Sequence, residues 1–268
     1  MSHKSNFASE LTWPVYDAAV RSGATPILIP LGSMEQHGHH MPMHVDVLLP
    51  TEFARRAAAE IGGLVAPTFT YGYKSHQKSG GGYHMPGTAS LDGATLVAAL
   101  RDVIKEFARH GARQICLVNG HFENSWFIIE AIDLALRELR WDRIEDVKIV
   151  VLSYWDFVDQ GTIDRLYPSG FPGWDKEHGG VLETSLMLAL FPDLVSMDCA
   201  VHHALAATFD LGGVCLLYTS DAADDLPCVD LGGRRFIKKK KNNHRDTTFN
   251  QLTLCQRAHI TRHTISPH

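Results

Sequence analysis

Residues 26–37, Pro-Ile-Leu-Ile-Pro-Leu-Gly-Ser-Met-Glu-Gln-His, indicate the fold class. The apolar run at 26–31 lies between Pro26 and Gly32, which is typical of a short buried strand. Residues 115–118, Ile-Cys-Leu-Val, repeat the pattern and lead into Asn-Gly-His-Phe-Glu at 119–123. In both places a buried strand is followed by a glycine and then by polar side chains.

Helical patterns alternate with these strands along the chain. Good helix formers or apolar residues at three- and four-residue spacing predict helices at 51–61, 96–107, 124–139 and 182–191. A third strand is expected at 147–152. Such alternation predicts an α/β fold with a parallel sheet and helices on both faces. Ligands of such sheets gather at the carboxyl ends of the strands.

The composition is that of an ordinary soluble globular protein, with 45% hydrophobic and 21% charged residues in 268. No apolar run approaches the ~20 residues of a membrane span, and the N-terminus does not resemble a signal peptide. Five cysteines without CxxC spacing favour free thiols in a reducing cytoplasm. Residues 1–210 hold 16 Lys and Arg against 25 Asp and Glu, and this acidity argues against nucleic acid as a partner.

Each strand-end motif places a carboxylate and an imidazole two residues apart. The first pair is Glu35 and His37, and the second is His121 and Glu123. In extended backbone, residues i and i+2 point to the same side, so each pair can direct both side chains into one cavity. Asp46 follows His37 by nine residues. Carboxylate and imidazole ligands suit zinc, manganese and similar divalent ions.

The charges of this set predict two metal ions. Glu35, Asp46 and Glu123 bring −3 to one sheet edge, which is unfavourable without counter-charge. Two divalent cations and a bridging hydroxide would balance the charge, and such a hydroxide is the nucleophile of many hydrolases. One Glu–His pair is common on protein surfaces, but two pairs after buried strands are not. Three histidines without such spacing are expected behind the ligands or in solvent: His39, His40 and His44.

Five segments resemble the creatininase family, in the family's order, and the likeness covers residues 10 to about 209. They are residues 32–54, 71–96, 108–139, 150–157 and 173–194. The Glu-x-His, Asp and His-x-Glu pattern is shared by the wider family. The Lys-Ser-Gly-Gly-Gly stretch at 78–82 and Gly-Trp-Asp-Lys-Glu-His-Gly-Gly at 173–180 are similar to the members that hydrolyse creatinine.

This resemblance implies a three-layer α/β/α sandwich with a mostly parallel central sheet, assembled as a homohexamer. It implies the reversible hydrolysis of creatinine to creatine at a binuclear centre. Glu35, Asp46 and His121 would hold one ion, and His37, Asp46 and Glu123 the other. One site would take zinc and the other zinc or manganese, and Glu123 would also serve catalysis.

The resemblance also assigns His178 as the proton shuttle, and an imidazole titrates in the right range for that work. Phe122 stands where the family has a tyrosine. Glu183 could orient His178, or could simply occupy the first turn of the following helix, where a carboxylate is favourable. The expected substrate contacts are Ser79, Phe122, Trp155, Trp174, Asp175 and Glu177.

The likeness ends near residue 210, which predicts a metal-hydrolase domain at 1–210 and a separate segment at 211–268. This segment holds nine Lys and Arg against five Asp and Glu, and residues 215–242 resemble translated adapter sequence followed by a poly-A stretch. A genuine divergent tail and a basic interaction arm are the alternatives. Without a sustained helical or strand period, the segment is expected to pack poorly.

We therefore expect a cytoplasmic metal hydrolase with creatinine or creatine as its small-molecule substrate, and no nucleic-acid or membrane partner. One alternative is a family member acting on another cyclic amide or a formamide. Another is a catalytically inactive metal-binding relic, because residues 211–268 differ from the family's closing strand and helix. A phosphoesterase is disfavoured, since no Arg or Lys cluster accompanies the ligands.

Overall fold

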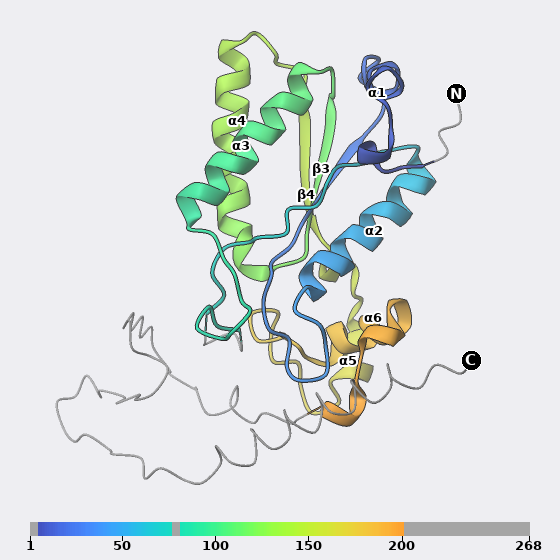
Figure 1. Cartoon of the computed structure of the whole chain (residues 1–268), viewed down its shortest axis with the longest axis vertical. Coiled ribbons are helices and arrows are strands. Elements are labelled where there is room, and N and C mark those ends of the chain that lie inside the picture. The colour runs from blue at the N-terminus through green and yellow to red at the C-terminus, as the bar shows by residue number, and fades with distance from the viewer. Residues whose placement is uncertain (1–4, 77–80, 201–268) are drawn as a thin grey trace, which may run out of the picture. The chain divides into compact units, whose positions relative to one another are not determined.

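The computed structural model describes residues 5–76 and 81–200, and its centre is a sheet of four parallel strands (Figure 1). The strands are β1 (Ile27–Leu31), β2 (Leu64–Val65), β3 (Gln114–Asn119) and β4 (Lys148–Ser153), in the spatial order β2-β1-β3-β4. β1 pairs with β3 from Ile27 opposite Ile115 to Leu31 opposite Asn119. The polar motifs that follow these two strands therefore leave the sheet at the same level.

Helices cover both faces of the sheet. Helices α3 (Gly93–Arg109) and α4 (Ser125–Trp141) pack together on one face, and α2 (Val45–Ile61) lies on the other (Figure 1). Alternate strand residues point to opposite faces. Ile29 and Leu117 belong to the core under α3 and α4, whereas Leu28 and Val118 pack against α2. This arrangement confirms the predicted α/β/α sandwich.

The start of α2 differs from the sequence prediction. The helix begins at Val45, not Thr51, and continues through Pro50. A proline usually ends a helix because it lacks the N–H that would bond the carbonyl four residues earlier, here that of Asp46. A Cβ on Gly32 would lie 2.5 Å from the Asp46 carbonyl oxygen, and one on Gly120 would lie 2.6 Å from it. These glycines follow β1 and β3, so the first turn of α2 lies against both strand ends.

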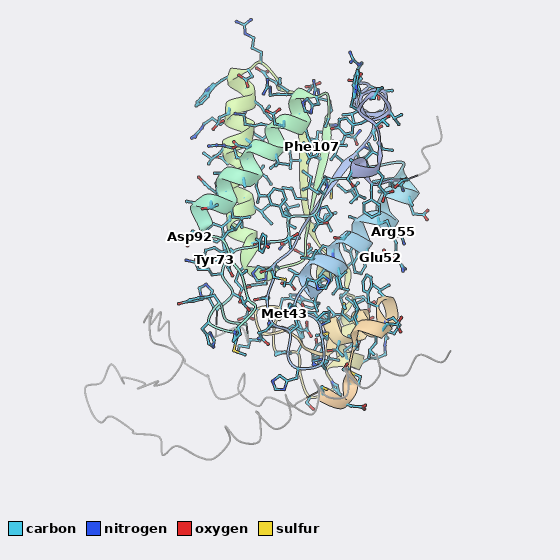
Figure 2. All side chains as sticks on the ribbon, in the orientation of Figure 1. Met43, Glu52, Arg55, Tyr73, Asp92 and Phe107 are labelled. Atoms are coloured by element: carbon cyan, nitrogen blue, oxygen red, sulfur yellow. The ribbon has the colours of Figure 1, made fainter. Side chains whose placement is uncertain are left out.

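The outer side of α2 is polar. Glu52 accepts hydrogen bonds of 2.7 Å from the side chains of Arg55 and Arg56. Figure 2 shows Glu52 and Arg55 on the side of α2 away from the strands. The apolar face of the helix, with Ala54 and Ala58, is therefore the one that packs on the sheet.

The remaining elements are short. They are α1 (Trp13–Val20), α5 (Gln160–Leu166), α6 (Val181–Leu190) and the 3-10 helices η1 (Ala8–Glu10), η3 (Phe122–Asn124), η4 (Tyr154–Phe157), η5 (Pro192–Leu194) and η6 (Met197–Cys199). The sequence did not predict α1 or α5. All of these elements except η6 belong to one compact unit, which holds residues up to His37 and from Met41 to Val195. Gly38–His40 and, among the described residues, 196–200 are assigned to a second unit.

Two further expectations concern the membrane and the cysteines. Within the described ranges, no helix has the length and apolar character to cross a bilayer. Cys116 is a free thiol, as expected. Ser79 and the predicted segment at 211–268 lie outside the described residues.

Candidate metal centre and active site

The strand ends and the first turn of α2 bring three candidate ligands together. Glu35 follows β1, His121 follows β3 and Asp46 lies in the first turn of α2, and all three side chains are buried. His121 Nδ1 lies 3.1 Å from Glu35 Oε1 and 3.0 Å from Asp46 Oδ2. The three residues form one group whose ligand atoms could surround a single ion.

Three of the four carboxylate oxygens of Glu35 and Asp46 lack hydrogen-bond partners in the described part of the chain. Among the described residues, no donor bonds to either oxygen of Glu35 or to Asp46 Oδ2. The nearest nitrogen to Glu35 Oε1 and to Asp46 Oδ2 is the same Nδ1 of His121, and a single N–H cannot satisfy both. Buried carboxylate oxygens without donors are costly. A divalent cation would satisfy them, so these residues fit a metal ion.

A second group forms around His37. His37 Nε2 lies 2.9 Å from Asp46 Oδ1 and 3.8 Å from Glu183 Oε2. His37, Asp46 and Glu183 are close enough to hold an ion together. Asp46 thus belongs to both groups, as expected of a bridging ligand.

Glu123 lines the same cavity as Asp46 and His121. Its Oε1 accepts a hydrogen bond of 3.3 Å from the backbone N–H of His76, and its Oε2 lies 3.5 Å from His121 Nε2. Within the described residues, the structure therefore does not bring Glu123 into a group with His37 and Asp46. Its role as a ligand stays a prediction.

The carboxylates of this cluster raise the pKa of two histidines, His37 and His121. Burial alone would lower the pKa of His37, but the charges of Asp46 and Glu183 outweigh it and raise the pKa to about 10. Burial alone would also lower the pKa of His121, but the negative charges of Glu35 and Glu123 and the nearby carboxylate of Asp46 raise it well above its usual range. A site that holds protons this firmly is chemically suited to cations.

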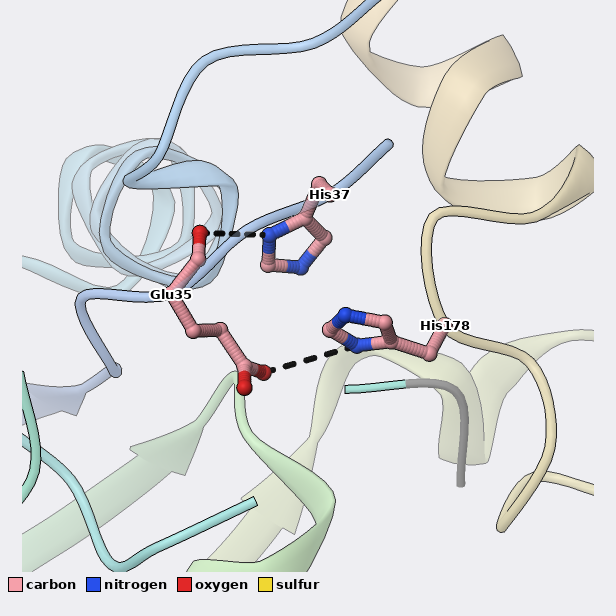
Figure 3. Close-up of side chains that lie close together, drawn as sticks. All are labelled: Glu35, His37 and His178. Carbon is pink, nitrogen blue, oxygen red and sulfur yellow. Dashed lines mark hydrogen bonds and ion pairs between the residues drawn. The ribbon is translucent and has the colours of Figure 1, made fainter. Parts of the chain in front are cut away.

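His178 approaches the cluster from the other side of the cavity. Its Nδ1 lies 3.4 Å from Glu35 Oε1, and its ring centroid is 4.4 Å from that of His37 (Figure 3). Nε2 donates a 2.6 Å hydrogen bond to the carbonyl of Gln36. Burial and the positive charge of His37 lower the pKa of His178. The neutral imidazole therefore keeps Nδ1 available to accept a proton on the side of Glu35.

One cavity joins these groups to most of the expected substrate contacts. Trp155 and Trp174 are half-buried, and both pack against the apolar cluster that contains Val45 and Leu182. The ring of Trp174 also contacts Phe171, with centroids 4.5 Å apart. The cavity is lined by Glu35, Asp46, Gly120, His121, Phe122, Glu123, Tyr154, Trp155, Trp174, Asp175, Glu177, His178, Leu182 and Glu183.

Two tyrosines at this site were not predicted. Tyr154 Oη donates to Glu183 Oε1 at 3.1 Å, and Tyr167 Oη donates to Glu177 Oε1 at 2.8 Å. Tyr154 follows β4 directly, as the other motifs follow β1 and β3, so its position in the sequence was a usable signal. Tyr167 lies directly after α5, and no pattern in the sequence indicated that it would reach this site. Three histidines belong to no metal-capable group among the described residues: His39, His40 and His44.

Comparisons with known proteins agree with this architecture. The creatininase family model, described as creatinine amidohydrolase, matches residues 9–225. This match extends beyond the predicted boundary at 210, which stays a prediction. The creatinine amidohydrolase of Pseudomonas putida is 63% identical over 207 residues, covering 77% of this chain and 79% of that protein.

Solved structures give the same result. A mutant creatininase complexed with creatine has a TM-score of 0.71 and 62% identity, covering 75% of this chain and 78% of its own. A mutant creatininase of the Zn-Zn type has a TM-score of 0.73 and 50% identity, covering 99% of this chain and 100% of its own. Identity falls as coverage rises, so the identical residues are concentrated in the part that both alignments share. The chain belongs to the creatininase family.

Proposed function

We propose that this chain hydrolyses the cyclic amide of creatinine to creatine, using two divalent metal ions. The observation that most supports this is the convergence of unsatisfied carboxylates and a neutral imidazole in one buried cavity, with His178 Nδ1 3.4 Å from Glu35 Oε1. The similarity to a creatinine amidohydrolase and to a creatininase complexed with creatine supports the choice of substrate.

The proposed metal ligands combine a group that the structure brings together with the assignment that the family resemblance implies. Glu35, Asp46 and His121 would hold one ion. His37 and Asp46 would hold the second with Glu123, as the family resemblance implies. Bound divalent ions would act as Lewis acids on the lactam carbonyl and lower the pKa of water. The Zn-Zn form of a related creatininase supports zinc, and manganese at one site remains part of the proposal.

His178 is assigned the proton transfer. Water adds its oxygen to the carbonyl carbon while Nδ1 of His178 accepts its proton. The same imidazole then donates that proton to the ring nitrogen as the C–N bond breaks, so the leaving nitrogen becomes an NH2 of the neutral guanidino group of creatine and the carbonyl becomes its carboxyl group. The hydrogen bond from Nε2 to Gln36 fixes the tautomer that this transfer needs.

The aromatic side chains and Asp175 would bind the substrate. Trp155 and Trp174 offer flat apolar surface for a small planar ring, and Asp175 offers a charge complementary to its guanidino nitrogens. Phe122 in the cavity wall lacks the hydroxyl of the family's tyrosine. This difference keeps a second candidate open, a family hydrolase for another cyclic amide or a formamide.

The assembly and location are proposed from the family resemblance alone: a homohexamer in the cytoplasm. Light scattering of the purified full-length chain tests the hexamer, which would have six times the chain's mass of 29.7 kDa. A stable monomer that turns over creatinine would remove the hexamer from the proposal.

A turnover assay with metals quantified on the same sample tests the function. Creatinine and creatine should interconvert, and elemental analysis should find about two ions per chain. Other cyclic amides, with different groups on the ring, and formamides are assayed separately as alternative substrates. Protein that holds two ions and turns over none of these compounds would be the inactive relic, and the proposal would fail.

A further inference from the structure

The loop at 173–180 brings His178 into the cavity. The carboxylate of Glu177, the residue just before His178, links this loop to the rest of the protein through hydrogen bonds. Glu177 Oε1 accepts a hydrogen bond of 2.9 Å from the backbone N–H of Leu182, and another of 2.8 Å from Tyr167 Oη. Leu182 lies in the first turn of α6, whose N-cap residue is Gly180. Because Gly180 has no side chain, Glu177 provides the capping acceptor in its place.

The carboxylate of Glu183 forms a hydrogen bond to the same loop just after His178. Glu183, in the first turn of α6, accepts a 2.6 Å hydrogen bond from the backbone N–H of Gly179. Gly179 has a φ of +60°, and a Cβ there would lie 3.1 Å from the carbonyl carbon of His37. The amide that Glu183 holds therefore adjoins His178 in sequence and packs against His37 in space.

Tyr154, the second hydrogen-bond partner of Glu183, is buried and packed against α2. Tyr154, whose hydroxyl donates to Glu183 Oε1, begins η4 directly after β4 and is buried. Its ring stacks on Phe53 of α2, with centroids 5.6 Å apart and planes 6° from parallel. A continuous series of contacts thus leads from the sheet through Tyr154 and Glu183 to the backbone beside His178.

We propose that Glu183, oriented by Tyr154, is a positioning residue that fixes the backbone of Gly179 and thereby the imidazole of His178. This inference rests on the proposed function, in which His178 transfers the proton. The competing assignment is a metal ligand beside His37 and Asp46. Glu183 differs from Glu35 in that both its oxygens already accept hydrogen bonds from the protein. This difference favours positioning.

Steady-state kinetics of two variants tests the assignment. Glu183→Ala removes the acceptor of Gly179 and should lower kcat by about 10–100-fold, the usual effect of losing a residue that orients a catalytic group, with KM little changed. Glu183→Gln retains an oxygen that can accept from Gly179, so it should keep most of the activity. Ser185→Ala, on the exposed side of the same helix, is the matched control and should match the unsubstituted chain.

A double-mutant cycle tests whether Glu183 acts through His178. In a His178→Ala background, Glu183→Ala should add little further loss, because the group it positions is already absent. If Glu183→Ala lowers kcat in the His178→Ala background by the same factor as in the unsubstituted chain, the proposal is overturned. Loss of one metal ion from Glu183→Gln would also overturn it and would assign Glu183 as a ligand.

Amide hydrogen exchange of metal-loaded protein tests the same idea without substrate. Peptides that cover residues 173–182 should exchange faster in Glu183→Ala than in the unsubstituted chain, and unchanged exchange would refute the positioning role. If the unsubstituted chain fails to hydrolyse creatinine, the proposed function fails while this result still decides the positioning. Should Glu183→Ala not fold, Tyr154→Phe removes only the hydroxyl and should show the same pattern to a smaller degree.

Discussion

The cavity is lined by two pairs of carboxylates that differ in the hydrogen bonds that their oxygens accept. Glu35 and Asp46, at the strand ends, have oxygens without hydrogen-bond donors among the described residues. Glu177 and Glu183, at the start of α6, accept hydrogen bonds from tyrosine hydroxyls and backbone amides. Because an unsatisfied buried charge is costly, the first pair favours bound cations, whereas the second pair already accepts hydrogen bonds from within the protein.

This difference separates ligands from positioning residues better than residue type does. All four side chains are carboxylates that line one cavity. Glu183 even lies 3.8 Å from His37, close enough to suggest a ligand from distance alone. The donors around each oxygen distinguish the two roles, and the predictions below test that distinction.

Removal of metal should have the largest effect. Treatment with a strong chelator should abolish creatinine turnover, since the bound ions supply both the Lewis acid and the activated water, and added zinc or manganese should restore it. Asp46→Asn weakens a ligand that both metal-capable groups share, the one with Glu35 and the one with His37, and should prevent restoration. Full activity in protein that elemental analysis finds free of metal would contradict the account.

Substitution of the proton shuttle should have the next largest effect. His178→Ala should lower kcat by about 10²–10⁴-fold, the range for loss of a general acid–base group, while the metal content stays the same. His110→Ala, on an exposed histidine at the end of α3, is the control. A near-normal kcat in His178→Ala would give the proton transfer to another group, such as Glu123.

The sequence predicted the parts of this site that depend on local pattern. Apolar runs predicted β1 and β3. Spacing of two residues predicted that the pair Glu35 and His37 and the pair His121 and Glu123 would each direct both side chains into one cavity. The start of α2 was missed, because Pro50 ordinarily ends a helix, whereas its contact with the Gly120 backbone is visible only in three dimensions.

The satisfied carboxylates could not be predicted in the same way. Tyr154 and Glu183 are 29 residues apart, and no local spacing relates them. Their pairing depends on how α6 packs against Tyr154 of η4 in one apolar cluster and on the stacking of Tyr154 on Phe53. The sequence therefore left two roles open for Glu183, and the hydrogen bonds of the folded chain favour one of them.

Metal affinity should depend moderately on pH. In the metal-free chain the pKa of His37 is raised to about 10, and metal binding requires the neutral imidazole. Protons therefore compete with metal throughout the neutral range, and zinc affinity should rise by about tenfold per pH unit for each proton released. Competition with a chromophoric chelator measures this slope. An affinity that is constant from about pH 6 to 9 would show that no such proton is displaced.

The smallest effect is expected at a carboxylate outside the cavity. Glu52 is satisfied by Arg55 and Arg56 on the outer side of α2. Exposed ion pairs of this kind contribute about 0–1 kcal/mol, so Glu52→Gln should change the free energy of unfolding by no more than that. Denaturant unfolding and elemental analysis should show near-normal stability and unchanged metal content. Loss of metal from this variant would mean that the metal content responds to general destabilisation.

The metal content of Glu35→Gln and Glu183→Gln, measured side by side, tests the central distinction most directly. Both substitutions replace a buried carboxylate of the same cavity by a neutral side chain of the same shape. We predict that the unsubstituted chain and Glu183→Gln hold about two ions per chain, whereas Glu35→Gln loses at least one. Retention of both ions by Glu35→Gln together with loss of an ion from Glu183→Gln would contradict the account.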